Sequence, residues 1–163
     1  MSKVNVALSR VLQKAARTGN PLVKRVLAGR AHPLMSRRLV LVSYTGRRTG
    51  RTYSTAVSYV RDGDVLLIPG GGRWWRNLGA GPVGVRLHGS AMSATPEVIT
   101  ELQAMSDLLS RMMAANPAFS VFTGIGQEPG GGPNPEDLDR ERRRGFVIVR
   151  LHLDQEAKAA RVA

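Results

Sequence analysis

Two glycine-bearing segments hold the residue types of this sequence that suit a phosphate. Residues 45–51 read TGRRTGR, and residues 70–77 read GGGRWWRN. Glycine leaves backbone N–H groups open to a ligand, and arginine guanidiniums bind phosphate through paired hydrogen bonds. The two tryptophans add apolar planes on which an aromatic ring can pack. Together the segments predict a site for a flat aromatic ligand that carries an anionic tail.

Both segments also have a plain structural interpretation, which the residues leave open. The arginines of residues 45–51 could form a solvated hairpin tip, and the glycines of residues 70–72 could be a flexible linker. Trp74 and Trp75 must point to different sides of a helix, so one of them is expected in the core. For residues 70–72, a loop that lets the backbone approach a ligand at the start of a helix is the preferred interpretation. For residues 45–51, the preference for phosphate binding rests chiefly on the family resemblance given below.

The sequence has no motif for a metal site, a disulfide or an acid–base pair. It has no cysteine, which excludes disulfides and cysteine-ligated zinc. His32, His88 and His152 lack the spacing of metal ligands, and Asp62 and Asp64 are typical of a hairpin rather than of an acid–base pair. We therefore expect no metal site.

Short strands and a few helices are expected to position the two segments. Apolar runs and alternation predict strands over residues 39–44, 54–61, 64–69, 81–87, 91–94 and 145–153. Periodicity and capping residues predict helices over residues 2–18, 20–28, 95–115 and 135–144. Residues 118–135 are predicted to be a loop that could close over a substrate as a mobile lid.

Length and charge set the outer limits. The 163 residues are most simply one domain, and no run approaches the roughly 20 apolar residues of a membrane span. The net charge is +12, and no acidic residue precedes Asp62. Such a field attracts polyanions of any kind, including nucleic acid, anionic lipid and a phosphate-bearing cofactor, so charge alone does not choose among them.

The order of these motifs resembles the deazaflavin-dependent nitroreductase family. The likeness is carried by the TGRRTG turn, two strands, the glycine-rich turn, the Trp74-Trp75 pair and Asn77-Leu78, within residues 20–153. Members are small actinobacterial proteins that bind the deazaflavin coenzyme F-420. The resemblance implies an α+β fold, a split, FMN-binding-like β-barrel of about six antiparallel strands with flanking helices. The expected parts are N-terminal amphipathic helices (1–30), the cofactor-binding barrel (31–155) and a flexible tail (156–163).

The resemblance also implies an activity and a set of site residues. The expected reaction is hydride transfer from reduced coenzyme F-420 to a quinone, a nitroaromatic or another conjugated acceptor. By the family's pattern Trp74 faces the cofactor and Trp75 the interior. Phe119 and Phe122 stand where relatives commonly carry tyrosine, so we expect them in the substrate pocket and expect the proton to come from solvent. The cofactor-binding residues so implied are Thr45, Gly46, Arg47, Arg48, Thr49, Gly50, Arg51, Pro69, Gly70, Gly71, Gly72, Arg73, Trp74 and Asn77.

Two departures from the family's pattern keep alternatives open. Thr52-Tyr53 stands where members often have Pro-Arg, and a glycine precedes Gly71-Gly72 where many carry a polar or basic side chain. An FMN-dependent reductase and a non-catalytic deazaflavin carrier are the alternatives. A nucleic-acid binder would explain the charge, but its motifs are missing, so no specific nucleic acid is expected.

Location and assembly follow from weaker signals. The absence of cysteine fits a cytoplasmic protein. The basic amphipathic pattern of residues 2–28 would allow contact with an anionic membrane. Split barrels of this kind often pair, so a homodimer is a further expectation.

Overall fold

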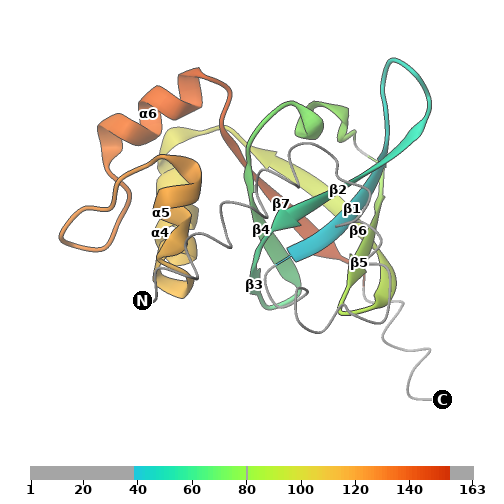
Figure 1. The fold of residues 1–163 in the computed structure, drawn as a ribbon, viewed down its shortest axis with the longest axis horizontal. Coiled ribbons are helices and arrows are strands. Elements are labelled where there is room, and N and C mark those ends of the chain that lie inside the picture. The colour runs from blue at the N-terminus through green and yellow to red at the C-terminus, as the bar shows by residue number, and fades with distance from the viewer. Residues whose placement is uncertain (1–38, 80, 155–163) are drawn as a thin grey trace.

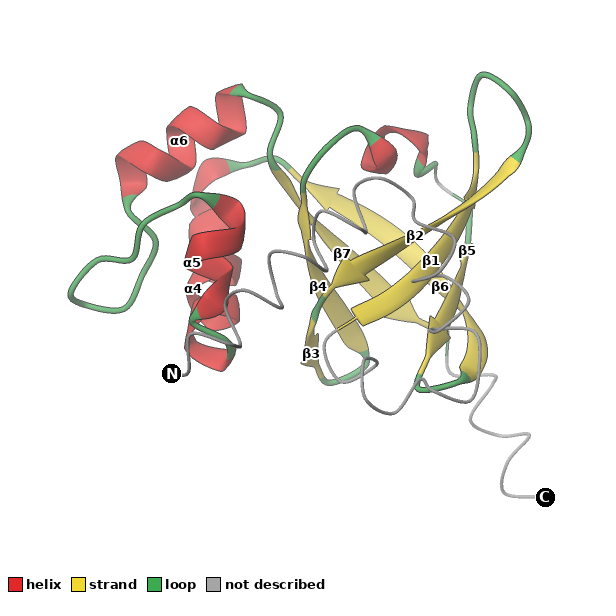
Figure 2. Cartoon of the chain, viewed as in Figure 1, coloured by secondary structure: helices red, strands yellow, loops and turns green. Residues whose placement is uncertain are grey.

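The computed structural model describes residues 39–79 and 81–154. The helices predicted within residues 1–30, the tail 156–163 and the membrane contact predicted for residues 2–28 lie outside this described part. A barrel with helices packed along one side makes up the fold (Figures 1 and 2). No helix of residues 39–79 and 81–154 is long and apolar enough to cross a bilayer.

Seven antiparallel strands form one sheet that curls into the barrel. Their order is β2-β1-β5-β6-β7-β4-β3, which leaves β2 and β3 as the two edges. This architecture confirms the predicted split β-barrel, with seven strands where about six were expected. The strands are β1 (Leu39–Thr45), β2 (Thr52–Ser58), β3 (Val60–Asp62), β4 (Val65–Gly70), β5 (Val83–Leu87), β6 (Ser90–Ile99) and β7 (Val147–Leu153).

Alternation along the strands divides the core into two clusters. In β7, Val147, Val149 and Leu151 point into the barrel, whereas Ile148 packs on the opposite face against helical side chains such as Met105. Residues at successive strand positions face opposite sides of a sheet, so one strand can serve both clusters. Burial of these apolar side chains is the main force that holds the barrel and the helices together.

The helices lie on the outer face of the sheet, beside β4 and β7 (Figure 1). They are α4 (Leu102–Ala115), α5 (Ala118–Thr123) and α6 (Pro135–Arg143). A separate single turn of 3-10 helix, η1 (Trp74–Asn77), lies over one end of the barrel (Figure 2). Because η1 follows directly on β4 and the glycine turn, the barrel itself sets its position.

The strand predicted over residues 54–61 is divided in the structure. β2 pairs with β1, whereas β3 pairs with β4 at the other edge of the sheet. Tyr59 stands between them, buried, and its hydroxyl lies 3.1 Å from Nε2 of His88. One apolar run thus serves two different partners, which local alternation does not reveal. The predicted hairpin between β3 and β4 is confirmed, but its turn is shifted by one residue: Asp62 is the last residue of β3 and pairs with Val65, so the two-residue loop is residues 63–64, with Gly63 at φ +61°.

The helix predicted to begin at residue 95 is wrong. β6 continues to Ile99 because its residues pair with β7, where Pro96 is opposite Leu151. This long-range ladder outweighs the local Thr-Pro-Glu capping signal. Helix α4 begins instead at Leu102, where the Glu101 carboxylate accepts hydrogen bonds from the N–H groups of Ala104 and Gln103. Those two donors hold the pKa of Glu101 below its ordinary value.

The predicted loop over residues 118–135 contains a helix. Residues 118–123 form α5, which ends at Gly124 with φ +73°. The next stretch of chain is tied to α6, because the N–H of Gly126 donates to Asp137 over 2.9 Å and the N–H of Asn134 donates to the carbonyl of Gly126 over 2.7 Å. The charged helix predicted over residues 135–144 is confirmed as α6, which Asn134 caps.

Candidate functional site

The arginine-bearing turn between β1 and β2, residues 45–51, is named the basic turn. It closes on itself through backbone hydrogen bonds. The N–H of Gly46 donates to the carbonyl of Arg51, and the N–H of Gly50 donates to the carbonyl of Gly46, each over 2.8 Å. Gly50 has φ +64°, a conformation that side chains disfavour. The glycines of the TGRRTG motif therefore shape a compact turn that holds its arginines at one end of the barrel.

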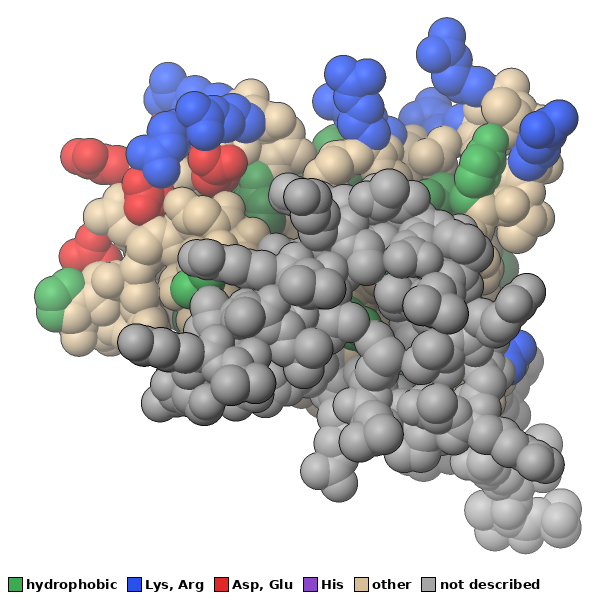
Figure 3. Space-filling view, viewed as in Figure 1, with side chains coloured by type: hydrophobic (Ala, Val, Ile, Leu, Met, Phe, Trp, Pro, Cys, Tyr) green, Lys and Arg blue, Asp and Glu red, His purple; other side chains and the backbone are tan. Residues whose placement is uncertain are grey.

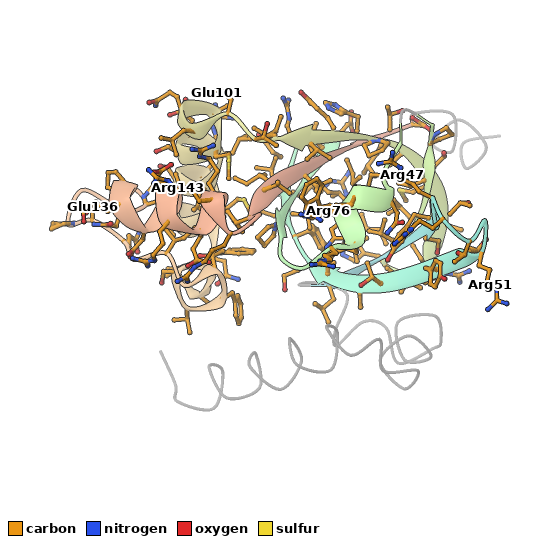
Figure 4. The ribbon with its side chains drawn as sticks, turned by 90° about the horizontal axis from the view of Figure 1, so that it is seen from above. Arg47, Arg51, Arg76, Glu101, Glu136 and Arg143 are labelled. Atoms are coloured by element: carbon orange, nitrogen blue, oxygen red, sulfur yellow. The ribbon has the colours of Figure 1, made fainter. Side chains whose placement is uncertain are left out.

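Hydrogen bonds join the basic turn to η1. The N–H of Arg47 donates to Oδ1 of Asn77, and Nη1 of Arg47 donates to the carbonyl of Arg76, both over 3.2 Å. Asn77 in turn donates through Nδ2 to the carbonyl of Trp74 over 3.2 Å. Figure 4 shows Arg47 and Arg76 close to each other at η1. The two segments singled out in the sequence thus meet at one end of the barrel.

The three glycines before η1 differ in what they do. A Cβ on Gly70 would lie 2.5 Å from Cγ2 of Val147 and 3.0 Å from its carbonyl oxygen, so strand packing requires this glycine. Pro69 and Gly70 belong to the β4–β7 ladder. Gly72 has φ +82° and open space where a Cβ would be. Gly71 and Gly72 are exposed, and the N–H of Gly71 donates to the carbonyl of Pro69 over 3.1 Å, so Gly72 is the glycine of this turn whose N–H has no partner among the described residues.

Several donors at this end have no acceptor. Among the described residues, the N–H groups of Arg48, Gly72 and Arg73 have no hydrogen-bond partner. The five arginines of this region, in the basic turn and from residue 73 to 76, make no ion pair with a described carboxylate. Basic side chains line this edge of the molecule above η1 and above the basic turn (Figure 3). This is the donor set that a phosphate requires.

Three aromatic rings form a row beneath these donors. Tyr53 stacks on Tyr44 with ring centroids 6.2 Å apart, and Tyr44 lies 6.0 Å from Trp74. Tyr44 and Trp74 pack against the barrel core, whereas Tyr53 is 42% exposed. Burial, and then Tyr53, raise the pKa of Tyr44, so its hydroxyl stays protonated at neutral pH.

The sequence analysis did not predict that Tyr44 and Tyr53 would lie beside the basic turn as a stacked pair, although a signal was available. Tyr44 and Tyr53 flank the basic turn and are directly paired across β1 and β2. Hairpin registration of the two strands about residues 45–51 would have placed their rings on the same face.

The tryptophans of η1 both pack on the barrel core. Trp74 contacts the tyrosine row, and the guanidinium of Arg76 lies 5.4 Å from the ring centroid of Trp75. Nε1 of Trp75 is shut off from solvent and has no hydrogen-bond partner among the described residues. This environment matches the expectation that Trp75 faces inward; whether Trp74 contacts a cofactor stays a prediction.

Some predicted site residues lie apart from this group. Phe119 is fully buried and Phe122 half-buried in the cluster under the helices, where their rings meet edge to face at 6.1 Å. Arg51 points outward from the tip of the basic turn (Figure 4). Within the described part of the chain, no three His, Asp or Glu side chains are close enough together to hold a metal ion.

Comparison with protein families gives one match. The model of the F420H(2)-dependent quinone reductase family matches residues 15–126, which includes the basic turn, the glycine turn and η1. A comparison with curated proteins gives no match.

Comparison with solved structures gives distant neighbours. An F420-H2 dependent reductase (FDR-A) is 14% identical, with 71% of this chain and 94% of that chain covered and a TM-score of 0.48. A domain-swapped dimer is 11% identical, with 92% and 99% covered and a TM-score of 0.50. A protein from Clostridium acetobutylicum related to general stress protein 26, of the pyridoxinephosphate oxidase family, is 12% identical, with 78% and 83% covered and a TM-score of 0.50. The last two support the fold.

Proposed function

The chain belongs to the F420H(2)-dependent quinone reductase family, and from this premise we propose that the basic turn and residues 71–77 hold coenzyme F-420 by its phosphate. When bound, the reduced deazaflavin supplies the hydride that a quinone-type acceptor receives. The protein's own part is to bind, orient and shield the reactants. The observation that carries the proposal is that arginines and backbone N–H groups with no partner among residues 39–79 and 81–154 meet at one end of the barrel.

The arginines at this end of the barrel repel one another, and an anionic group would lower that repulsion. Arg48 and Arg73 are exposed and have no carboxylate partner among the described residues. Like charges held close together repel, so such a group of guanidiniums is stabilised when an anion joins it. Arg47 has a second task, because its guanidinium is bonded to the carbonyl of Arg76. We assign it both to the anion and to the junction between the basic turn and η1.

Trp74 and Asn77 take different roles in the proposal. Trp74 is a half-buried ring of η1 that adjoins the tyrosine row, and we assign it to the aromatic part of the cofactor. Both ends of the Asn77 amide are engaged, with the N–H of Arg47 and the carbonyl of Trp74. We therefore assign Asn77 to holding Arg47 and Trp74 in place. Phe119 and Phe122 are left out because their rings pack in the helical cluster.

Titration with two cofactors tests the proposal. Addition of oxidised coenzyme F-420 should quench the tryptophan fluorescence with micromolar or tighter affinity, and FMN should bind more weakly. Turnover is measured with the reduced coenzyme and a water-soluble quinone, through the return of the oxidised coenzyme's fluorescence. Tighter binding of FMN would favour the flavin alternative, and binding without turnover would favour the carrier.

Assembly and location are further proposals. One structural neighbour is a domain-swapped dimer, and we propose that this chain also pairs with itself, which light scattering after gel filtration would measure. We propose a cytoplasmic location, with contact to anionic membrane through residues 2–28. Sedimentation with anionic and neutral vesicles tests the contact, and equal binding to both would reject it.

A further inference from the structure

Tyr53 is held by the basic turn at two points. Its hydroxyl shares a hydrogen bond with Oγ1 of Thr49, the two oxygens being 3.1 Å apart. Gly46 lies directly against its ring, because a Cβ on Gly46 would be 2.5 Å from Cε2 and 3.1 Å from Cδ2 of Tyr53. The tyrosine thus contacts the beginning and the middle of the turn at once.

The same turn is held on its other side by Asn77, through the N–H of Arg47. Arg48 lies between the two attachments, and its N–H has no partner among the described residues. Thr49 also accepts the N–H of Arg51 through Oγ1, over 3.3 Å. Loss of the Tyr53 hydroxyl would remove the side-chain attachment of Thr49 and leave it to its backbone bond, in which its N–H donates to the carbonyl of Gly46 over 3.3 Å. The attachment to Asn77 would stay in place.

The row of rings connects the turn to the barrel core. Tyr53 stacks on Tyr44, which neighbours Trp74, and the latter two pack against the inner cluster. The phenol of Tyr53 brings no charge, so it adds nothing directly to the attraction of an anion. Its effect on a ligand must pass through the geometry of the turn.

We propose that the Tyr53 hydroxyl is a positioning group that fixes the basic turn, through Thr49, in the conformation that binds the anionic part of the cofactor. The inference rests on the proposed function. It assigns Tyr53 to the phosphate and its tail, and not to the deazaflavin ring. The affinity for a ligand that has the deazaflavin ring but no phosphate should therefore not depend on the Tyr53 hydroxyl.

The test uses Tyr53→Phe beside Tyr59→Phe. The control removes another tyrosine hydroxyl that contacts a side chain, here His88, away from the basic turn. Affinity is measured for coenzyme F-420 and for its phosphate-free riboside. For Tyr53→Phe we expect Kd and KM for F-420 to rise about three- to tenfold, as for loss of one hydrogen bond, with kcat and riboside affinity unchanged. Tyr59→Phe should change neither affinity.

A second pair of variants approaches the bond from the other side. Thr49→Val removes the bond to Tyr53 and also the bond that Thr49 accepts from the N–H of Arg51, so it should weaken F-420 binding at least as much as Tyr53→Phe. Thr49→Ser keeps a hydroxyl and should restore most of the affinity. The double variant Tyr53→Phe/Thr49→Val should be less than additive, because the two changes share the bond between Tyr53 and Thr49.

The outcomes separate the two proposals. If Arg48→Ala leaves F-420 affinity unchanged, the anion site itself is misplaced. If Arg48→Ala weakens binding but Tyr53→Phe does not, the positioning role alone is rejected. Equal weakening of F-420 and riboside by Tyr53→Phe would also reject it, because a general loss of structure does not distinguish the two ligands.

Discussion

Arginines gather in two regions of this molecule, and the two groups are held very differently. On α6 and its C-cap each of four arginines contacts a carboxylate of α6, whereas at the end of the barrel five arginines contact no carboxylate of residues 39–79 and 81–154. The α6 group is Arg140, Arg142, Arg143 and Arg144, paired with Asp137, Asp139 and Glu141. The barrel-end group is Arg47, Arg48, Arg51, Arg73 and Arg76.

The difference shows which charge is available for a ligand. Figure 3 shows basic side chains above α6 as well as above η1 and the basic turn, so surface colour does not separate the groups. On α6 the carboxylates lie within reach along the helix and neutralise the charge where it stands. At the barrel end no described carboxylate offsets the repulsion, which an anion would relieve. Unpaired charge, rather than charge itself, marks the candidate site.

The strongest test removes the same charge from both regions. Arg47→Ala/Arg48→Ala should weaken coenzyme F-420 binding by about 10- to 100-fold, since one or two charge-assisted hydrogen bonds are lost. Arg142→Ala/Arg143→Ala lowers the net charge equally and should leave the affinity within about twofold, because these side chains already bind Asp139. Fluorescence titration at fixed ionic strength measures both.

The control pair decides what a loss of affinity means. Equal weakening by both double variants would show that F-420 responds to the overall field and would remove the distinction between the regions. The salt dependence adds a second criterion, since a purely long-range effect fades as added salt screens it.

Two glycines of the same turn, Gly70 and Gly72, are expected to contribute differently to stability. Gly70→Ala places a Cβ against Val147 and should destabilise the barrel by about 1–3 kcal/mol, as overpacking does. Gly72→Ala meets no atom, but its φ of +82° strains the alanine, so we expect a loss of about 1 kcal/mol. Urea denaturation measures the order of the two; a larger loss for Gly72→Ala would mean that packing at Gly70 relaxes easily.

Two asparagines extend the comparison to neutral side chains. Asn77→Ala removes one of the two hydrogen bonds that attach the basic turn to η1 and should weaken F-420 binding about fivefold, with little loss of stability. Asn134→Ala removes the N-cap of α6 and should cost about 1 kcal/mol of stability without a change in affinity. Melting temperature and Kd are measured for both, and a reversed assignment of the two effects would overturn the division of roles.

Much of the fold was predictable because its signals are local. Apolar runs, the hairpin signal at Asp62-Gly63 and the charged helix each act over a few neighbouring residues. The structure has a strand, a hairpin and a helix at these places, with the hairpin turn shifted by one residue. The failures occur where distant pairing decides. The ladder with β7 keeps residues 95–99 extended, and the change of partner at Tyr59 divides one predicted strand into two.

The candidate site was predictable in its charges but not in its supports. The motif order pointed to residues 45–51 and 70–77, and the structure brings them together. Tyr53 entered the sequence analysis only as a departure from a family pattern, although its ring packs against Gly46 and its hydroxyl bonds to Thr49. Asn77 was expected to face the cofactor, yet its amide bonds to the chain. Such contacts depend on the register between strands and loops, which sequence spacing does not give.

The smallest expected effect concerns pH and lies on α6. The N–H of Gly126, and then Arg140, hold the pKa of Asp137 below its ordinary value of 3.8. A carboxyl with a depressed folded pKa contributes stability that is fully present above its unfolded pKa and is lost as pH falls through the folded pKa. Asp137→Asn should therefore lower stability slightly at pH 7 and flatten its decline below about pH 4. Denaturation curves at several pH values, with Glu136→Gln as a control from the same helical turn, would show this. If the stability of Asp137→Asn fell at low pH as steeply as that of the unchanged protein, the proposed contribution of the Asp137 carboxylate would be wrong. F-420 affinity should stay constant in both variants.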